Sequence, residues 1–241
     1  GGSGEHRFAP DVDAASAAAL VERHFNREVE AAAAPAAPAA PAARERAALV
    51  TDDLDKNQAH IIVGFDAPVI ESEDRYALEV LHAVLSGQGG RLFFELRDRQ
   101  SLAYSVYASM LLGLDCSTFM INIGTSPEKI EQALRGIIGE VRRLSDEPPS
   151  AQEIEDARRY LIGNHDIGLQ RNSARAMSVA LDELYELGFK RAFEYGDHIQ
   201  AVTPEGLQSV IEGYLDLSRV VVSVTKPAEV EVAQGLLDEL L

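Results

Sequence analysis

The order in which strand and helix patterns follow one another constrains the fold of this chain more than any other feature. Two strand patterns are followed by two helical patterns, two more strands, further helices and a last strand. A doubly wound parallel sheet requires strands and helices to alternate, so this order argues against one. The sequence predicts an α+β fold in two layers, with helices packed mainly on one face of a mostly antiparallel sheet.

Residues 57–68 give the clearest strand pattern, because apolar side chains recur there at every second position. One face of this strand would carry Ala59, Ile61, Val63 and Phe65. Further strands are predicted over 45–53, 102–110, 115–124 and 218–227. The strands 102–110 and 115–124 are expected to pair antiparallel, because only a short connection separates them.

Helices are predicted where apolar residues recur at helical spacing, namely over 11–26, 72–87, 89–100, 125–145, 151–170, 172–188, 191–202, 203–215 and 228–241. Two of them have clear start signals. Ser126 and Pro127 are suited to the first positions of the helix over 125–145. Ser150 and Glu153 form a capping-box pattern at the start of the next helix.

The N-terminal region is predicted to differ from the rest of the chain. Residues 1–12, with the opening GGSGEH, resemble an added tag remnant or a ragged start. Residues 13–241 are predicted to form a single domain, interrupted by an Ala/Pro-rich loop at 30–45. Prolines recur there at every third position, which blocks a continuous helix and favours an extended spacer.

The charge and composition narrow the classes of partner. The 241 residues carry a formal net charge of −17, which repels phosphate backbones and anionic membrane surfaces, so no nucleic-acid partner is expected. No run of 18 apolar residues occurs, so we expect a soluble protein without a membrane span. The single cysteine, Cys116, excludes an intramolecular disulfide and is predicted to be a buried, inert thiol.

No motif for a metal or phosphate site is complete in this chain. None of the six histidines begins a His-x-x-x-His or His-x-x-Glu-His pair, so a helical zinc site is not predicted. Glu79 and His82 have the Glu-x-x-His spacing of a di-iron ligand pair, but a second pair is missing, and His82 is expected to be a core or boundary residue. The glycines of SGQGGRLFF lack the residues that complete a phosphate-binding loop.

Five segments together resemble one enzyme family. In order along the chain they are NQAHIIVGF, GGRLFFELRDRQSLAYSVYA, INIGTSPEKIEQAL, EIEDARRYLIGN and HIQAVTPEGLQSVIEGYL. This succession is similar to the C-terminal, non-metal-binding domain of the insulinase/pitrilysin-type zinc peptidases, which include the mitochondrial processing peptidases. The resemblance extends from about Asp13 to Pro227.

The resemblance implies a division of labour between domains. Such enzymes are built from related α+β domains that close around a peptide substrate. Their zinc is held by a His-x-x-Glu-His helix in a separate catalytic domain, where the Glu acts as general base. The resemblance therefore implies that this chain binds no zinc itself, is inactive alone, and works with a zinc-bearing domain in the same full-length chain or in a partner subunit.

The resemblance also implies a pair of functional residues, because the family domain carries an Arg-x6-Tyr pattern. Arg97 and Tyr104 match that pattern. Arg97 would bind the peptide, and Tyr104 would orient or stabilise the reacting carbonyl group. Arg91 and Arg99 are alternatives by charge alone, but neither has the required spacing to Tyr104. Without the resemblance, the same residues would be interpreted as a solvated helix arginine and a core aromatic.

Two other interpretations remain open within the same fold. The chain could be a non-catalytic partner subunit that lends Arg97 and Tyr104 to a zinc-bearing chain, or a structural scaffold, as in core subunits of respiratory cytochrome complexes. The presence of both residues favours a component of a zinc endopeptidase that acts on peptides.

Overall fold

A five-stranded sheet lies at the centre of the computed structural model, which describes residues 13–25, 44–55, 57–86, 89–233 and 235–241. The strands are β1 (Ala48–Asp53), β2 (Ala59–Ala67), β3 (Ser105–Leu111), β4 (Ser117–Thr125) and β5 (Val221–Lys226). Their order across the sheet is β1-β5-β2-β4-β3. Only the β1–β5 pair is parallel, so the predicted α+β fold with a mostly antiparallel sheet is confirmed.

The alternating pattern of β2 decides which face of the sheet is covered. Ala59, Ile61 and Val63 are fully buried, while His60 between them is exposed. The neighbouring strand β4 buries Phe119, Ile121 and Ile123 on the same side, because Ile61 pairs with Ile123 and Val63 with Ile121. A one-residue shift of either strand would move these side chains into solvent, which fixes the register.

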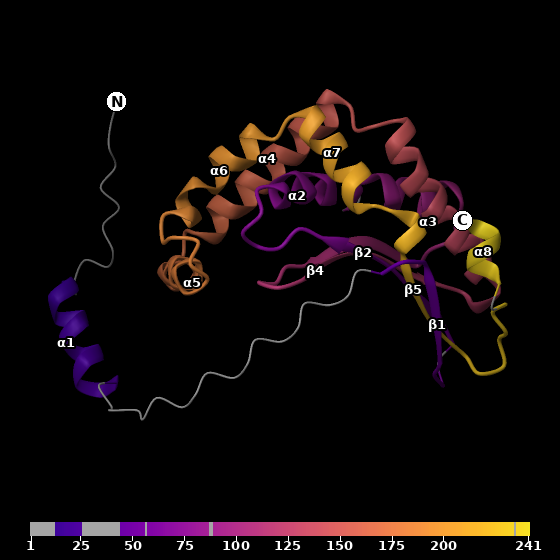
Figure 1. The fold of residues 1–241 in the computed structure, drawn as a ribbon, viewed down its shortest axis with the longest axis horizontal. Coiled ribbons are helices and arrows are strands. Elements are labelled where there is room, and N and C mark those ends of the chain that lie inside the picture. Colours follow the sequence, from indigo (N-terminus) through magenta and orange to yellow (C-terminus); the bar gives the residue numbers. More distant parts are fainter. Residues whose placement is uncertain (1–12, 26–43, 56, 87–88, 234) are drawn as a thin grey trace.

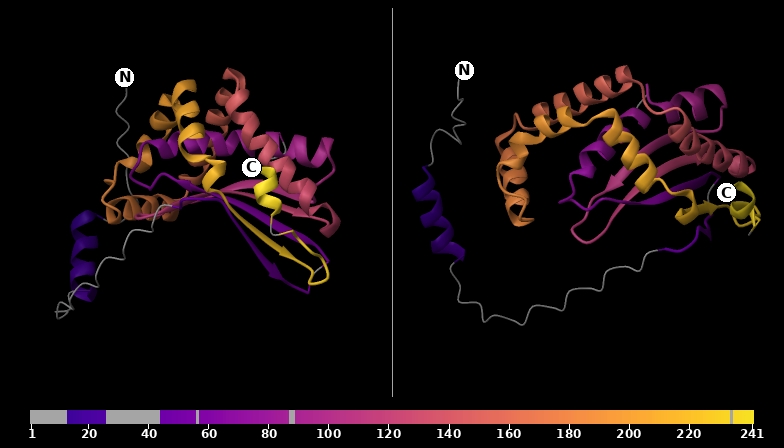
Figure 2. Two further views of the ribbon diagram at one scale, coloured as in Figure 1. Left: turned by 45° about the vertical axis from the view of Figure 1, so that its right-hand side comes forward. Right: turned by 45° about the horizontal axis from the view of Figure 1, so that its top comes forward.

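The helices cover that apolar face and leave the other face open, as Figures 1 and 2 show. The helices that follow the first two strands are α2 (Asp74–Leu85), α3 (Ile130–Asp146), α4 (Ala151–Gly168), α5 (Asn172–Leu184), α6 (Arg191–Ala201), α7 (Pro204–Tyr214) and α8 (Leu236–Leu240). Helix α1 (Ala14–Phe25) stands apart from the sheet (Figure 1). Helices α3 and α7 contact the sheet directly, while α4 packs on α2 and α6 packs on α4. Short helical segments η1 (Phe93–Arg99), η2 (Pro127–Lys129) and η3 (Leu217–Arg219) complete the chain.

Helix α3 illustrates how the sequence pattern produces this packing. Its predicted apolar stripe is entirely buried, comprising Ile130, Ala133, Leu134, Ile137, Ile138, Val141 and Leu144. These positions fall at intervals of three and four residues, so they line one side of the helix. Full burial of each large aliphatic side chain contributes about 1.5–3 kcal/mol, which makes α3 a main element of the core.

Two predictions about the chain require correction. The helix expected over 228–241 is confined to α8, because Val230 and Val232 pack against the core from an irregular segment. Cys116 is exposed and not buried, because it lies in the β3–β4 connection and β4 begins one residue later. The predictions for residues 1–12 and for most of the loop at 30–45 fall outside the described residues; Arg44 and Glu45 are exposed and irregular.

Candidate functional site

The segment from Arg97 to Tyr104 joins η1 to β3 and is held by hydrogen bonds at both ends. The Arg97 carbonyl accepts from the Ser101 amide at 3.1 Å, and the Leu96 carbonyl accepts from the Leu102 amide at 2.8 Å. At the other end, the Tyr104 amide donates to the Gly124 carbonyl of β4 at 2.8 Å. The backbone positions of both candidate residues are therefore fixed by the adjoining elements.

Side chains from β4 and η2 reinforce this connection. The Thr125 hydroxyl, fully buried, donates to the Leu102 carbonyl at 2.5 Å. The Lys129 ammonium donates to the Ser101 carbonyl at 2.9 Å. Leu96, next to Arg97, is fully buried and lies against α3, where a Cβ on Gly136 would come within 2.7 Å of its Cδ2 atom. A side chain at position 136 would therefore require Leu96 to shift.

Both candidate side chains lie on the surface. Arg97 is exposed, and its guanidinium carbon lies 4.7 Å from the centre of the Phe93 ring. Tyr104 is 58% exposed. Within the described part of the chain, no hydrogen bond joins the two side chains, so the structure places them at the two ends of one turn without a direct bond.

The other arginines of this segment are already paired. Arg91 donates to both carboxylate oxygens of Glu153, at 2.6 and 2.9 Å, and to the Glu147 carbonyl at 2.8 Å. Arg99 donates to Glu95 at 2.8 Å. Among the described residues, no carboxylate lies within ion-pair distance of Arg97, which leaves its guanidinium available to an external acceptor.

The sheet face opposite the helices presents a row of side chains that no helix covers. Cross-strand pairing aligns Val50, Ser223, Ile62, Asn122 and Tyr107 across all five strands. Val50, Ile62 and Tyr107 are 55%, 38% and 49% exposed. This row gives the domain a partly apolar open surface, with polar groups of Ser223 and Asn122 between the apolar side chains.

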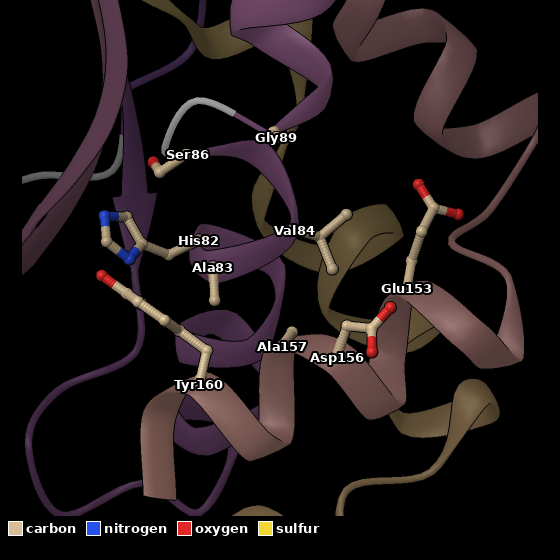
Figure 3. Close-up of a pocket in the computed structure, with 10 residues that line it drawn as sticks. His82, Ala83, Val84, Ser86, Gly89, Glu153, Asp156, Ala157 and Tyr160 are labelled. Carbon is tan, nitrogen blue, oxygen red and sulfur yellow. The ribbon is translucent and has the colours of Figure 1, made fainter. Parts of the chain in front are cut away.

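A cavity of about 570 Å³ lies elsewhere, between α2 and α4 (Figure 3). Three of its polar side chains, those of His82, Glu153 and Asp156, already have partners. The His82 ring bonds to the Ala108 carbonyl at 3.0 Å, and burial lowers the pKa of His82, which favours the neutral ring. Asp156 accepts from Arg159 at 2.6 Å. In Figure 3 the Tyr160 side chain extends toward the His82 ring.

The structure offers no metal centre within the residues it describes, since no three His, Cys, Asp or Glu side chains gather there in a way that could hold an ion. Glu79 and His82, considered as ligands, lie in different surroundings. The Glu79 carboxylate accepts from the Tyr195 hydroxyl at 2.7 Å, and burial raises its pKa. The expectation that His82 is a boundary residue is confirmed.

Sequence reasoning did not find the residues that support the candidate pair. Thr125 and Lys129 act on the turn from more than 20 residues away, through contacts that only the folded chain brings together. Thr125 lies at the boundary between a predicted strand and a predicted helix, and no local signal distinguishes it. The Arg91–Glu153 ion pair was missed for the same reason, although Glu153 was identified as part of the capping box.

No helix formed by the described residues has both the length and the apolar character that a bilayer-spanning helix needs.

Comparisons with known proteins place this arrangement in a family. The family model described as the peptidase M16 inactive domain matches residues 8–161. An uncharacterized zinc protease of Mycobacterium bovis is 30% identical over 208 residues, which cover 84% of this chain and 47% of the relative. The chain therefore spans about half the length of the curated relatives that it matches.

Solved structures support the same fold. A protease from Helicobacter pylori superposes with a TM-score of 0.82 at 19% identity, covering 90% of this chain and 54% of that one. A peptidase M16 inactive domain from Pseudomonas fluorescens gives a TM-score of 0.70 at 22% identity, covering 78% of this chain and 45% of that one. The resemblance inferred from the sequence is confirmed, and the chain belongs to the peptidase M16 family of zinc proteases as its inactive, C-terminal domain.

Proposed function

We propose that this domain supplies substrate contacts to a zinc endopeptidase whose metal site lies in another domain. Arg97 binds the peptide backbone or a substrate carboxylate, and Tyr104 donates a hydrogen bond to the carbonyl that is hydrolysed. The observation that carries the proposal is the state of Arg97. Its guanidinium is exposed and has no carboxylate partner in the described residues, whereas Arg91 and Arg99 are both engaged.

The chemistry of these two side chains suits peptide hydrolysis. Attack on a peptide bond moves negative charge onto the carbonyl oxygen, and fixed hydrogen-bond donors stabilise that charge. A guanidinium has five N–H donors and no acceptor, and a phenol can donate one hydrogen bond. The zinc of the companion domain would polarise the carbonyl group and activate water. Arg97 and Tyr104 would hold the substrate against that site from the opposite side.

The rigid connection between the two residues supports this role. A donor stabilises a transition state best when it does not have to reorganise during the reaction. The backbone of Arg97 is bonded to Ser101, and that of Tyr104 to Gly124, so both side chains extend from fixed backbone positions.

The test of Arg97 compares two neighbouring arginines in the complete zinc-containing enzyme. Arg97→Ala should lower kcat/KM about 10–100-fold, mainly through a higher KM, because hydrogen bonds to charged groups contribute about 1.5–3 kcal/mol. Arg99→Ala is the matched control, since Arg99 is also exposed but pairs with Glu95. Steady-state kinetics on a peptide substrate measure both variants. Equal kcat/KM values for Arg97→Ala and the wild type would remove Arg97 from the site and favour a scaffold role.

A further inference from the structure

Helix α1 is amphipathic, yet none of its residues is buried. Its apolar stripe includes Leu20, Val21 and Phe25, which are 54%, 57% and 79% exposed. Figure 1 shows α1 standing apart from the sheet and from the helices that cover it. An apolar stripe of this kind normally packs on another element, so the partner of α1 has to be sought outside the core of this domain.

The helix is well specified despite this exposure. The Asp13 carboxylate accepts from the Ser16 amide at 2.9 Å and from the Ser16 hydroxyl at 2.7 Å, which satisfies one of the free amides at the helix start. Isolated helices of 12 residues are nevertheless marginal in water, because most helical stability in proteins comes from packing. The sequence of α1 therefore specifies a helix start and an apolar face, but that face packs on no described part of this domain.

The C-terminal end of the chain shows what such a segment does when it is docked. Residues 10–25 read PDVDAASAAALVERHF, and residues 227–241 read PAEVEVAQGLLDELL. Both run from a proline through an acidic–Val–acidic triplet to two adjacent apolar residues, an acidic residue and a later apolar one. The spacing from Leu20 to Phe25 equals that from Leu236 to Leu241.

In the second segment two of the three matching apolar residues are buried, while Leu241, the counterpart of Phe25, is 40% exposed. Leu236 and Leu237, the counterparts of Leu20 and Val21, are 5% and 3% exposed in α8. Helix α8 packs on α3, and the Arg142 side chain donates to the carbonyls of Leu240 and Leu241 at 2.9 Å each. The place on α3 that suits such a helix is therefore already occupied by this domain's own α8.

We infer that α1 is the closing helix of a second domain of this fold and docks on that domain's counterpart of α3, as α8 docks here. The inference rests on the proposed function, because the second domain is taken to be the zinc-bearing one. The relative from Mycobacterium bovis has room for it, since the matched region makes up 47% of its length.

The experiment compares the 241-residue chain with the full-length gene product, using hydrogen exchange and thermal unfolding. In the full-length protein the amides of residues 20–25 should exchange about 100-fold or more slowly than in the 241-residue chain, because docking protects them. Leu20→Asp should abolish this protection and lower the Tm of the full-length protein. Ala19→Asp, on the opposite face of α1, is the matched control and should change neither quantity.

Several results would overturn the inference. If Leu20→Asp lowers the Tm of the 241-residue chain, then α1 packs on this domain. If the 241-residue chain forms a dimer that Leu20→Asp dissociates, the occupant is a second copy. Rapid exchange of residues 20–25 in the full-length protein, or a gene product with no domain of this fold before residue 1, would also contradict it. These measurements do not depend on peptidase activity. They can therefore contradict the docking of α1 while the kinetics of Arg97→Ala support the proposed function, or support the docking while the kinetics contradict that function.

Discussion

Ser101 adopts a left-handed backbone conformation, with φ at 51°, in the middle of the turn between Arg97 and Tyr104. For a residue other than glycine this conformation is uncommon and costs about 1–2 kcal/mol. The hydrogen bonds around it offset that cost, since the Ser101 amide donates to Arg97 and its carbonyl accepts from Lys129. At the scale of single residues, the turn is therefore held in one conformation by its neighbours.

Cys116 leads to a prediction at the same scale. Because its side chain is exposed, an aqueous thiol reagent should modify one thiol per folded chain, at a rate close to that in denaturant. Colorimetric thiol titration with and without guanidinium chloride measures this. A thiol that reacts only after unfolding would show that Cys116 is buried. The sequence predicts burial because Cys116 lies in an alternating apolar stretch, but in the structure β4 begins only at Ser117.

At the scale of elements, the start of α4 is tied to the segment before η1. The Ser150 hydroxyl accepts from the Glu153 amide, and the Glu153 carboxylate accepts from the Ser150 amide, which completes the predicted capping box. The same carboxylate binds the Arg91 guanidinium through both oxygens. The Arg91 guanidinium and the hydrogen bonds from Ser150 lower the pKa of Glu153 to about 2.

This lowered pKa predicts a pH dependence of stability. A carboxylate whose folded pKa lies below its unfolded value stabilises the fold above the unfolded value, and the contribution is lost as pH falls through the folded pKa. For Glu153 the loss falls between pH 4.5 and about 2. After allowance for solvent at this partly exposed group, it amounts to on the order of 1–2 kcal/mol.

Glu153→Gln should therefore reduce the free energy of unfolding at neutral pH and flatten its decline between pH 4.5 and 2. Urea unfolding at a series of pH values measures this. Glu131→Gln is the control, because the Glu131–Arg135 pair is exposed on α3 and surface pairs contribute about 0–1 kcal/mol. If the free energy of unfolding of both variants falls with pH in parallel with that of the wild type, the Arg91–Glu153 pair does not cause the loss of stability in acid.

Local sequence patterns predict the helices and strands better than they predict which of these elements pair or pack with one another. The alternation in β2 and the stripe on α3 are visible in the sequence, because burial on one face imposes a period of two or of three to four residues. The insertion of β5 between β1 and β2 depends on pairing across more than 150 residues, which leaves no local signal. For the candidate site, the sequence provided Arg97 and Tyr104 through a family resemblance, while their exposure and support required the fold.

At the scale of the whole molecule, this domain should bind no zinc tightly and hydrolyse no peptide when it is isolated. The reason is that neither a His-x-x-Glu-His helix nor, within the described residues, a group of three metal ligands is present. Metal analysis of the dialysed chain should find well under one zinc per molecule, and a peptide substrate should remain intact. Stoichiometric zinc together with chelator-sensitive hydrolysis would show a metal site of its own.

Participation of this domain in the reaction through Tyr104 is tested most directly by kcat of the complete zinc-containing enzyme. Tyr104→Phe removes a hydroxyl that acts mainly as charge develops, so kcat should fall by about 10²–10³ with little change in KM. Tyr107→Phe is the control, because Tyr107 is 49% exposed three residues further along the chain. A Tyr104→Phe enzyme whose kcat equals that of the wild type and of Tyr107→Phe would contradict the account.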